Sequence, residues 1–287
     1  MTALPLDVSV VALPSGVRFA HSVEFATIEG FRPLVLDLHL PPAPLATAGA
    51  CPVVVYFHGG GWAVGTRRRF GRAFRSWSPT PMERIALAGL AIASVDYRLS
   101  GEAIFPAQLD DALAAVRWVK ANADGLGLAA DRVVAWGESA GGHLAAMVGL
   151  TADDTAVVRG VIDWYAPTDL VHAGRQRRPD ATSDPDGPDS WEARFVGAPL
   201  PAAPDRAAAA SPITHVHAGA PPFQIHHGDE DRVVPFEQSA SLARALRAVG
   251  VAVELVTVPG SDHFWTGAPD LEQIFEASLA FARLVTA

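Results

Sequence analysis

A serine stands between two glycines in the segment Gly137-Glu138-Ser139-Ala140-Gly141. An apolar run precedes the segment and small, apolar residues follow it, so the serine falls where a strand is expected to give way to a helix. The sharp turn leaves no room for neighbouring side chains, which holds the hydroxyl out at the carboxyl edge of a sheet. The positive end of the following helix points at the same place. We therefore predict that Ser139 is a nucleophile, the alternative being a glycine-rich turn that only serves packing.

A second glycine-rich segment, His58-Gly59-Gly60-Gly61-Trp62, follows an earlier apolar run. Glycines allow several backbone N–H groups to converge on one point without obstruction, as the oxyanion of a tetrahedral intermediate requires. We predict that the N–H groups of Gly60, Gly61 and Ala140 form an oxyanion hole. His58 is expected to orient the loop and to take no part in the chemistry.

A serine nucleophile needs a base, and the base needs an acid that fixes its tautomer. Among the ten histidines, His263 follows the last expected strand and is the predicted base. Asp231, in a turn between an expected strand and helix, is the predicted acid; Asp229 in the same turn is its rival, and Asp262 is too close to His263 in sequence. The other histidines in candidate positions are expected to be structural: His143, His215, His217, His226 and His227.

Strands and helices alternate along the chain, which favours an α/β fold. Alternating residues over 8–40 predict antiparallel strands, and apolar runs predict strands at 53–57, 90–95, 132–136, 158–164, 223–226 and 251–258. Helices are expected from 80, over 106–122, from 140, over 235–248 and over 269–285. We predict one domain, 1–287, with a mostly parallel sheet covered by helices on both faces. The irregular stretch 168–211 is predicted to be a lid-like insertion.

Composition narrows the classes of function. The chain has 287 residues, 49% of them hydrophobic, and a net charge of −9, which argues against a disordered chain and against nucleic acid as a partner. The single Cys51 and the absence of clustered His and Cys give no support to a disulfide or a metal site. No leader or membrane-spanning stretch is evident, so a cytoplasmic protein is expected, and a homo-oligomer stays open.

Aromatic residues at the ends of expected strands and in the irregular stretch are candidates for the wall of a substrate pocket. They are Trp62, Trp164, Tyr165, Trp191, Phe195, Phe264 and Trp265, and for any single one of them a place in the core is the alternative. A run of arginines from Arg67 to Arg75 follows the glycine-rich loop. It is expected to be a solvated face, with a rim that attracts anionic substrates as the alternative.

The order serine, aspartate, histidine is that of α/β-hydrolases. From about Cys51 to Phe281 the sequence resembles that superfamily, and within it the hormone-sensitive-lipase-like and feruloyl/acetylxylan-esterase-like carboxylesterases. The resemblance is carried by HGGGW, GESAGG and HGDEDRVVP, together with Asp96-Tyr97-Arg98-Leu99-Ser100. It implies ester hydrolysis through an acyl-enzyme, without a cofactor, by Ser139, Asp231 and His263, but it does not fix the ester. The aromatic pocket candidates favour a small or aromatic acyl or alcohol group. The departure is the stretch from Thr168 to Arg206, which is longer and more charged than in the family pattern.

Three other functions are compatible with these residues to different degrees. An arylformamidase-like amidase would apply the same groups to a C–N bond. A non-catalytic ligand-binding relative would keep the fold, but here nucleophile, base and acid are all present. A peptidase is disfavoured, because the residues before Cys51 are too few for the extra domain that admits and selects peptides.

Overall fold

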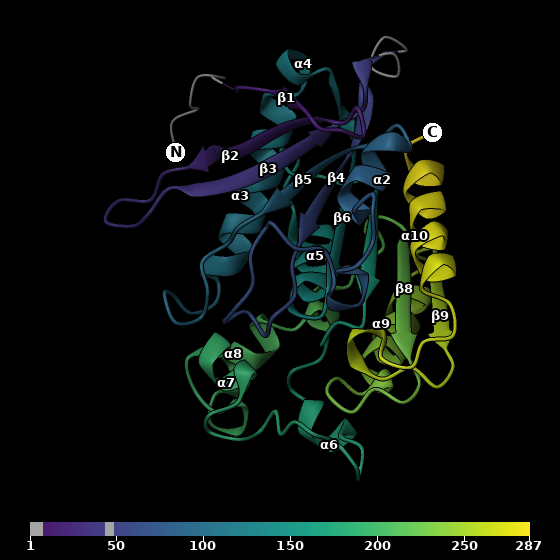
Figure 1. The fold of residues 1–287 in the computed structure, drawn as a ribbon. Helices are drawn as coiled ribbons and strands as arrows, with labels where there is room; N and C mark the ends of the chain where they lie inside the picture. Colours follow the sequence, from purple (N-terminus) through teal and green to yellow (C-terminus); the bar gives the residue numbers. More distant parts are fainter. Residues whose placement is uncertain (1–7, 44–48) are drawn as a thin grey trace.

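A nine-stranded sheet runs through the computed structural model, which describes residues 8–43 and 49–287 (Figure 1). The strand order is β1-β2-β3-β5-β4-β6-β7-β8-β9. The strands are β1 (Val11–Ala12), β2 (Arg18–Ala26), β3 (Leu34–Leu40), β4 (Cys51–Phe57), β5 (Ala91–Val95), β6 (Leu128–Glu138), β7 (Gly160–Trp164), β8 (Phe223–Gly228) and β9 (Val253–Val258).

The sheet changes from antiparallel to parallel along its width. β1, β2, β3 and β5 pair antiparallel, whereas β5, β4, β6, β7, β8 and β9 pair parallel. The central strand β4 carries Val53, Val54, Val55, Tyr56 and Phe57, all fully buried, as expected for a strand covered on both faces. Because the parallel strands run the same way, their carboxyl ends share one edge of the sheet, and the loops of the predicted site follow them.

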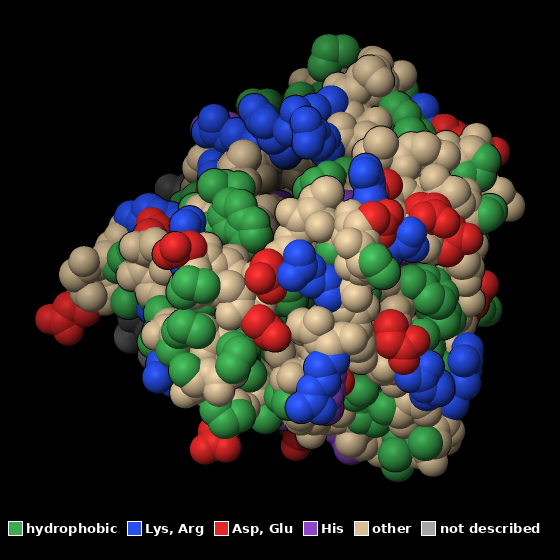
Figure 2. All heavy atoms as spheres, turned by 90° about the horizontal axis from the view of Figure 1, so that it is seen from below, with side chains coloured by type: hydrophobic (Ala, Val, Ile, Leu, Met, Phe, Trp, Pro, Cys, Tyr) green, Lys and Arg blue, Asp and Glu red, His purple; other side chains and the backbone are tan. Residues whose placement is uncertain are grey.

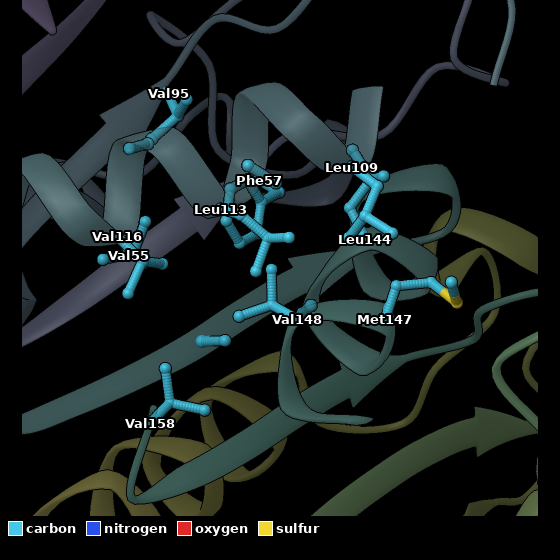
Figure 3. Close-up of a cluster of buried hydrophobic side chains, with 14 of the residues drawn as sticks. Val55, Phe57, Val95, Leu109, Leu113, Val116, Leu144, Met147, Val148 and Val158 are labelled. Carbon is cyan, nitrogen blue, oxygen red and sulfur yellow. The ribbon is translucent and has the colours of Figure 1, made fainter. Parts of the chain in front are cut away.

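Helices cover both faces of the sheet. On one face lie α3 (Ala107–Ala121), α5 (Ala140–Thr151) and α9 (Phe236–Ala248), whose apolar side chains join the larger core cluster. Figure 3 shows the part of this cluster in which α3 and α5 meet the strands. On the other lie α2 (Pro81–Leu87) and α10 (Leu271–Val285), which share a core rich in aromatic rings. The predicted fold class, a mostly parallel sheet between two helical layers, is confirmed.

Two helices begin where their sequences indicate a cap. Thr80 and Glu83 form a capping box before α2: the Glu83 N–H donates to Thr80 Oγ1 (3.3 Å) and the Thr80 N–H to Glu83 Oε2 (3.0 Å). Asp270 accepts the Gln273 N–H at 3.0 Å before α10. These caps fix the ends of both helices on that face of the sheet.

The stretch 168–211 is less irregular than predicted. It contains α6 (Ala173–Gln176), α7 (Trp191–Val196) and α8 (Pro204–Ala209), linked by turns. Each helix is too short for a 3.6-residue period to show in the sequence. The stretch is tied to the body of the protein, since Ser183 Oγ donates to the Val233 carbonyl (2.6 Å) and the Thr182 N–H to the Arg232 carbonyl (2.8 Å).

Candidate active site

Ser139 occupies a strained turn between β6 and α5. Its φ is 52° and its ψ −122°, outside the regions favoured by residues with a side chain. Its N–H donates to the Trp164 carbonyl (2.7 Å), and its carbonyl accepts the His143 N–H (2.9 Å). A Cβ on Gly137 would lie 2.1 Å from the Gly141 oxygen, and one on Gly141 would lie 2.0 Å from the Phe57 oxygen. Both flanking glycines are therefore required by space.

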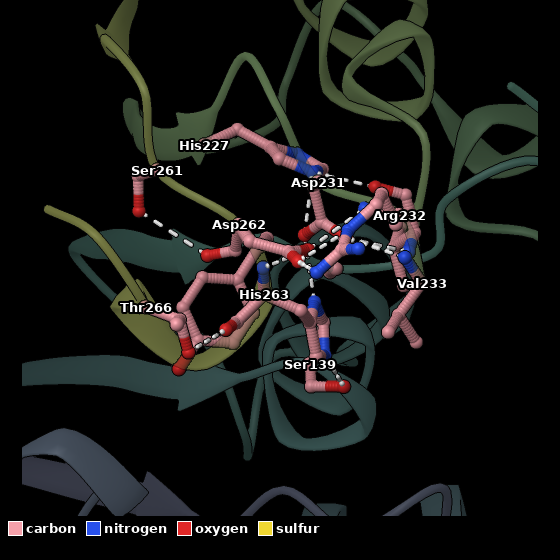
Figure 4. Close-up of polar contacts among 12 residues, drawn as sticks. Ser139, His227, Asp231, Arg232, Val233, Ser261, Asp262, His263 and Thr266 are labelled. Atoms are coloured by element: carbon pink, nitrogen blue, oxygen red, sulfur yellow. Dashed lines mark hydrogen bonds and ion pairs between the residues drawn. The ribbon is translucent and has the colours of Figure 1, made fainter. Parts of the chain in front are cut away.

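Ser139, His263 and Asp231 form one hydrogen-bonded line (Figure 4). His263 Nε2 lies 3.0 Å from Ser139 Oγ, and His263 Nδ1 lies 2.6 Å from Asp231 Oδ2. All three side chains are buried. With Nδ1–H donated to the aspartate, Nε2 is free to accept the serine proton, which is the arrangement that activates a hydroxyl.

The carboxylate of Asp231 is fixed from several sides. Its Oδ1 accepts the N–H groups of Val233 and Val234, each at 2.8 Å, and His227 Nε2 lies 3.3 Å from its Oδ2. Burial alone would raise the pKa of Asp231, but the electrostatic attraction of the His263 ring and the hydrogen bonds from His227 and His263 outweigh burial and hold this pKa below its usual range. Asp231 thus stays ionised at neutral pH.

The two rival acids have other partners. Asp229 Oδ1 accepts the Gly260 N–H at 2.7 Å. Asp262 accepts the backbone N–H (2.9 Å) and the Nε–H (2.6 Å) of Arg232. These contacts fix the two turns that carry Asp231 and His263 beside each other.

The glycine-rich loop lies against the serine. Gly60 and Gly61 share one pocket with Ser139 and Ala140, and the Gly60 carbonyl accepts the N–H groups of Ala63 and Val64, each at 3.1 Å. Below the loop, His58 stacks on Tyr97 with 4.4 Å between ring centroids, and the Tyr97 hydroxyl donates to the His58 carbonyl (2.8 Å). Burial lowers the pKa of His58. A neutral, enclosed imidazole fits the predicted role in orienting the loop.

Trp62 connects the loop to the nucleophile helix and to the 168–211 stretch. Its ring stacks on Phe195 of α7 with 4.1 Å between centroids, and its Nε1–H donates to His143 Nδ1 (3.3 Å). His143 Nε2 lies 2.7 Å from the Ala210 carbonyl oxygen and donates its proton to it. Burial lowers the pKa of His143 to about 4, so the ring is neutral and each nitrogen has the role its partner requires.

The pocket in front of Ser139 has a volume of about 180 Å³. Three of the seven aromatic candidates line it: Trp62, Trp191 and Phe264. Most other wall residues are small or aliphatic, namely Val64, Pro167, Val233 and Val234. The pocket is therefore narrow and largely apolar.

The other four aromatic candidates do not line this pocket, in contrast to the prediction. Trp164 points toward α10 and donates its Nε1–H to Ser278 Oγ (2.9 Å). Tyr165 donates to Glu138 Oε2 (2.7 Å), and Trp265 packs against the edge of the Tyr165 ring. Phe195 lies behind Trp62. In a strand covered on both faces, successive side chains are all buried, whichever face they point to. The sequence therefore does not show whether the aromatic residue at the end of such a strand points toward the loops or into the core.

Sequence reasoning missed two residues beside this site. Glu192, the second residue of α7, lies on the pocket wall, and its pKa is raised, chiefly by burial. His227 was expected to be structural, yet it contacts the carboxylate of Asp231. Its position two residues before Asp229 in the HGDEDRVVP turn was the only signal.

The arginine run is not uniformly a solvated face. Arg67 is buried and bridges two acids, with its Nε 2.7 Å from Asp37 Oδ1 and its Nη1 2.5 Å from Asp96 Oδ2. Arg68, Arg69, Arg72 and Arg75 are exposed. The expectation is therefore wrong for Arg67, because the buried carboxylate of Asp37 requires a cation beside it, and the partly exposed Asp96 holds the same guanidinium.

Within residues 8–43 and 49–287, no helix is long and apolar enough to cross a membrane. The same residues contain no group of three or more His, Cys, Asp or Glu side chains placed to hold a metal ion.

Comparison with known proteins identifies relatives over most of the chain. The BD-FAE family model matches residues 36–246. The carboxylesterase NlhH of Mycobacterium tuberculosis is 31% identical over 245 residues, covering 82% of this chain and 72% of NlhH. The esterase LipC of the same organism is 32% identical over 224 residues, covering 74% of this chain; the chain spans only 52% of LipC, about half its length.

Solved structures show the same architecture. A truncated carbohydrate esterase from gut microbiota superposes with a TM-score of 0.78 at 27% identity, over 96% of this chain and 99% of that one. Esterase 2 of the planctomycete Thermogutta terrifontis, with propionate bound, has a TM-score of 0.69 at 27% identity, over 94% and 93% of the two chains.

Proposed function

Because this chain belongs to the BD-FAE family of α/β-hydrolase carboxylesterases, we propose that it is a serine esterase that hydrolyses small carboxylic esters through an acyl-enzyme. One observation carries the proposal: the unbroken line from Ser139 Oγ through His263 to Asp231, beside the glycine-rich loop. Nucleophile, base, acid and oxyanion donors are the parts that acyl transfer needs.

In the first half-reaction, Ser139 Oγ attacks the ester carbonyl while His263 Nε2 takes the hydroxyl proton. The carbonyl oxygen becomes an oxyanion, which the N–H groups of Gly60, Gly61 and Ala140 stabilise; one such donor is worth about 100-fold to 1000-fold in turnover. His263 then passes its proton to the leaving alcohol as the ester C–O bond breaks. Asp231 stabilises the imidazolium without taking its proton.

In the second half-reaction, a water molecule takes the place of the alcohol. His263 removes a proton from the water, whose oxygen attacks the acyl carbonyl, and returns that proton to Ser139 Oγ as the acyl bond breaks. The products are a carboxylic acid and the free enzyme. In both half-reactions Ser139 supplies the nucleophilic oxygen or releases it, and His263 transfers each proton.

The pocket supports a small acyl group. Its volume of about 180 Å³ is below the roughly 300–1000 Å³ of pockets that hold drug-sized ligands. Two of the similar solved structures are described as Thermogutta terrifontis esterase 2 with propionate or with butyrate bound. We infer the same range of acyl length here, with Trp191 and Phe264 offering contacts to a small or aromatic alcohol group.

A series of p-nitrophenyl esters tests this proposal. We expect kcat/KM to be highest for acetate to butyrate and to fall for octanoate. Ser139→Ala should lower kcat by about 10⁴-fold or more and abolish labelling by a fluorophosphonate probe. Ser76→Ala, which removes an exposed serine hydroxyl, should leave both unchanged. Labelling that persists in Ser139→Ala would reject the site, and faster turnover of formanilide than of any ester would favour the amidase alternative.

Two further expectations from the sequence stay predictions. One is a cytoplasmic location, and the other is the possibility that the chain forms a homo-oligomer. Sedimentation or light scattering of the full chain measures the second directly.

A further inference from the structure

A larger cleft lies apart from Ser139. Its volume is about 630 Å³, within the range of small-molecule sites, and none of its lining residues lines the pocket around the serine. It opens between strands β2 and β3, the arginine segment and the start of α2. The lining residues are Phe19, His21, Asp37, His39, Arg68, Arg69, Phe70, Phe74, Arg75, Thr80, Pro81 and Met82.

The rim of the cleft is basic. Arg68, Arg69 and Arg75 line it and are exposed, and none of them forms an ion pair with a carboxylate in the part of the chain that the structure describes. Viewed from the carboxyl ends of the strands, basic side chains gather along one edge of the molecule next to a hollow (Figure 2). Three guanidinium groups at one opening favour an anion, because each offers a planar fork of donors.

The acids near the cleft are already engaged. Asp37, on the floor, accepts the Arg67 Nε–H (2.7 Å) and the Ser22 N–H (2.7 Å). Glu83 accepts the hydroxyl of Ser15 (2.6 Å) and closes the capping box with Thr80. These carboxylates keep their charge, but their oxygens are held by other donors and none of them pairs directly with Arg68, Arg69 or Arg75 among the described residues.

His39 adds a buried polar group on the floor. It is 8% exposed and lines the cleft, and its Nδ1 has no hydrogen-bond partner among residues 8–43 and 49–287. Its ring lies 4.6 Å from that of Phe19. Burial, opposed by Asp37 and Glu83, lowers the pKa of His39 to about 4, so the imidazole is neutral at pH 7. A buried nitrogen without a partner is uncommon in proteins, and because this atom has almost no accessible surface, a ligand in the cleft supplies the missing hydrogen bond only if the ring turns toward the cleft.

We propose that this cleft binds a small organic anion, a carboxylate or a phosphate monoester, with its charged head on Arg68, Arg69 and Arg75 and a hydrogen bond from the His39 imidazole, and with its apolar body over Phe70, Phe74 and Met82. The buried aromatic and aliphatic side chains exclude a fully hydrated inorganic ion as the best ligand, because such an ion leaves the apolar floor without a contact. The inference depends on the cleft alone and holds whether or not Ser139 is a nucleophile.

Isothermal titration of the full chain with octanoate, octyl phosphate, octanol and inorganic phosphate tests the proposal. Octanoate or octyl phosphate should bind at least tenfold more tightly than octanol and inorganic phosphate. The tighter of the two anions identifies the head group. Equal binding of octanol would show that the arginines play no part, and equal binding of inorganic phosphate would show that the apolar floor plays none; either result overturns the proposal.

Variants locate the bound anion. Arg75→Glu and Arg68→Glu should each weaken binding at least tenfold, with unchanged thermal unfolding. Arg72→Glu is the matched control: Arg72 is an exposed arginine of the same segment that lies over the Phe264 ring and does not line the cleft. Ser139→Ala should also bind normally. Unaltered affinity in Arg75→Glu, or lost affinity in Ser139→Ala, would place the anion elsewhere and reject the site.

His39 is tested separately. His39→Phe keeps an aromatic ring beside Phe19 but removes both nitrogens, and should weaken binding several-fold while inorganic phosphate stays a poor ligand. Affinity equal to that of the wild type would mean that the imidazole makes no contact with the head group, contrary to the proposal.

Discussion

His227 gives the carboxylate of Asp231 a second imidazole partner. The Ser239 hydroxyl lies 2.6 Å from His227 Nδ1 and donates to it, which leaves the proton on Nε2. That N–H faces both the Val234 carbonyl (2.9 Å) and Asp231 Oδ2 (3.3 Å). His227 is therefore a positioning residue: it acts on the reaction through Asp231 and does not touch the substrate pocket.

We expect His227→Phe to lower kcat for p-nitrophenyl acetate about tenfold. A hydrogen bond to a charged group contributes roughly 1.5–3 kcal/mol, of which about 1.4 kcal/mol corresponds to tenfold in rate. KM should change little, because His227 does not line the pocket. Ser239→Ala keeps the imidazole and loses only the hydroxyl that fixes its tautomer, so its effect should be smaller. A wild-type kcat in His227→Phe would contradict this role.

Glu192 should discriminate between neutral and anionic substrates. Glu192 lines the pocket, so a negatively charged acyl group bound there meets a like charge nearby. Two like charges about 4 Å apart in water repel by about 1 kcal/mol, and partial burial of Glu192 makes this a lower bound, so we expect a factor of about five or more in kcat/KM. Glu192→Gln should therefore raise kcat/KM about fivefold or more for the p-nitrophenyl monoester of succinate.

The effect of Glu192→Gln should grow with pH. The pKa of Glu192 is raised, mainly by burial, so its negative charge is absent at low pH and complete only above that raised pKa. The neutral butyrate ester should respond little at any pH. Glu230→Gln, which removes a nearby acid that does not line the pocket, is the control. Equal gains for both esters would argue for a steric effect in place of a charge effect.

At the scale of elements, α7 packs against the glycine-rich loop and forms part of the pocket wall. It brings Trp191 and Glu192 to the pocket wall and stacks Phe195 on Trp62. Its first turn is capped by Ser190 Oγ, which accepts the Ala193 N–H at 2.9 Å. The helix has only six residues, so its own hydrogen bonds hold it weakly and the cap matters.

We expect Ser190→Ala to destabilise α7 by about 1 kcal/mol, the usual value of an N-cap side chain. The loss should appear as faster amide exchange in 190–197 and a several-fold higher KM, with kcat less affected. Thr80→Ala removes a cap of the same kind from α2, on the other side of the sheet, and serves as the control. If both variants raise KM equally, α7 has no specific part in substrate binding.

How far the sequence predicts these elements depends on their length and on which faces they bury. The apolar run at Val53–Phe57 and the helix expected from residue 80 correspond to β4 and α2, and the Thr80–Glu83 capping box explains why that helix begins there. Trp164 and Asp163 are neighbours on a strand covered on both sides, and an apolar run does not state which of the two faces α10. Contacts that join distant segments, such as Arg67 with Asp37 and Asp96, leave no local pattern at all.

For the site, the residues set by turn geometry are the predictable ones. Gly137 and Gly141 are demanded by backbone atoms less than 3 Å away, and such positions leave glycine as a visible mark. Glu192 and His227 carry no such mark, because their roles depend on where α7 and the end of β8 are placed in the folded protein. The hydrogen-bonded line of Ser139, His263 and Asp231 accords with the predicted roles, which activity measurements on variants must test.

At the scale of the whole molecule, buried ionisable groups make stability depend on pH in two opposite directions. Burial lowers the pKa of His39, His143 and His226 to about 4 each, so between about pH 4 and 6.5 the unfolded chain binds protons that the folded chain does not. Stability from these groups therefore rises with pH in that window. Asp163 acts oppositely: burial, partly offset by His227 and the Ala166 N–H, raises its pKa to about 7, so its contribution falls between about pH 4 and 7.

His226 separates these contributions, because burial alone accounts for its shift and neither ring nitrogen has a partner among the described residues. Lowering the pH from 7 to 5 should reduce the free energy of unfolding less in His226→Leu than in the wild type, by about 2 kcal/mol. The reason is that pH 5 lies about 1.5 units below the pKa of about 6.5 that histidine has in the unfolded chain, and each unit is worth about 1.4 kcal/mol. Guanidinium unfolding at both pH values measures it. Asp163→Asn is the paired variant with the opposite sign: it keeps an oxygen for the Ala166 N–H (3.0 Å) and should steepen the rise in stability from pH 5 to 7. Identical pH dependence in His226→Leu and wild type would mean that His226 takes up its proton in the folded state as readily as in the unfolded one, so that water reaches the ring.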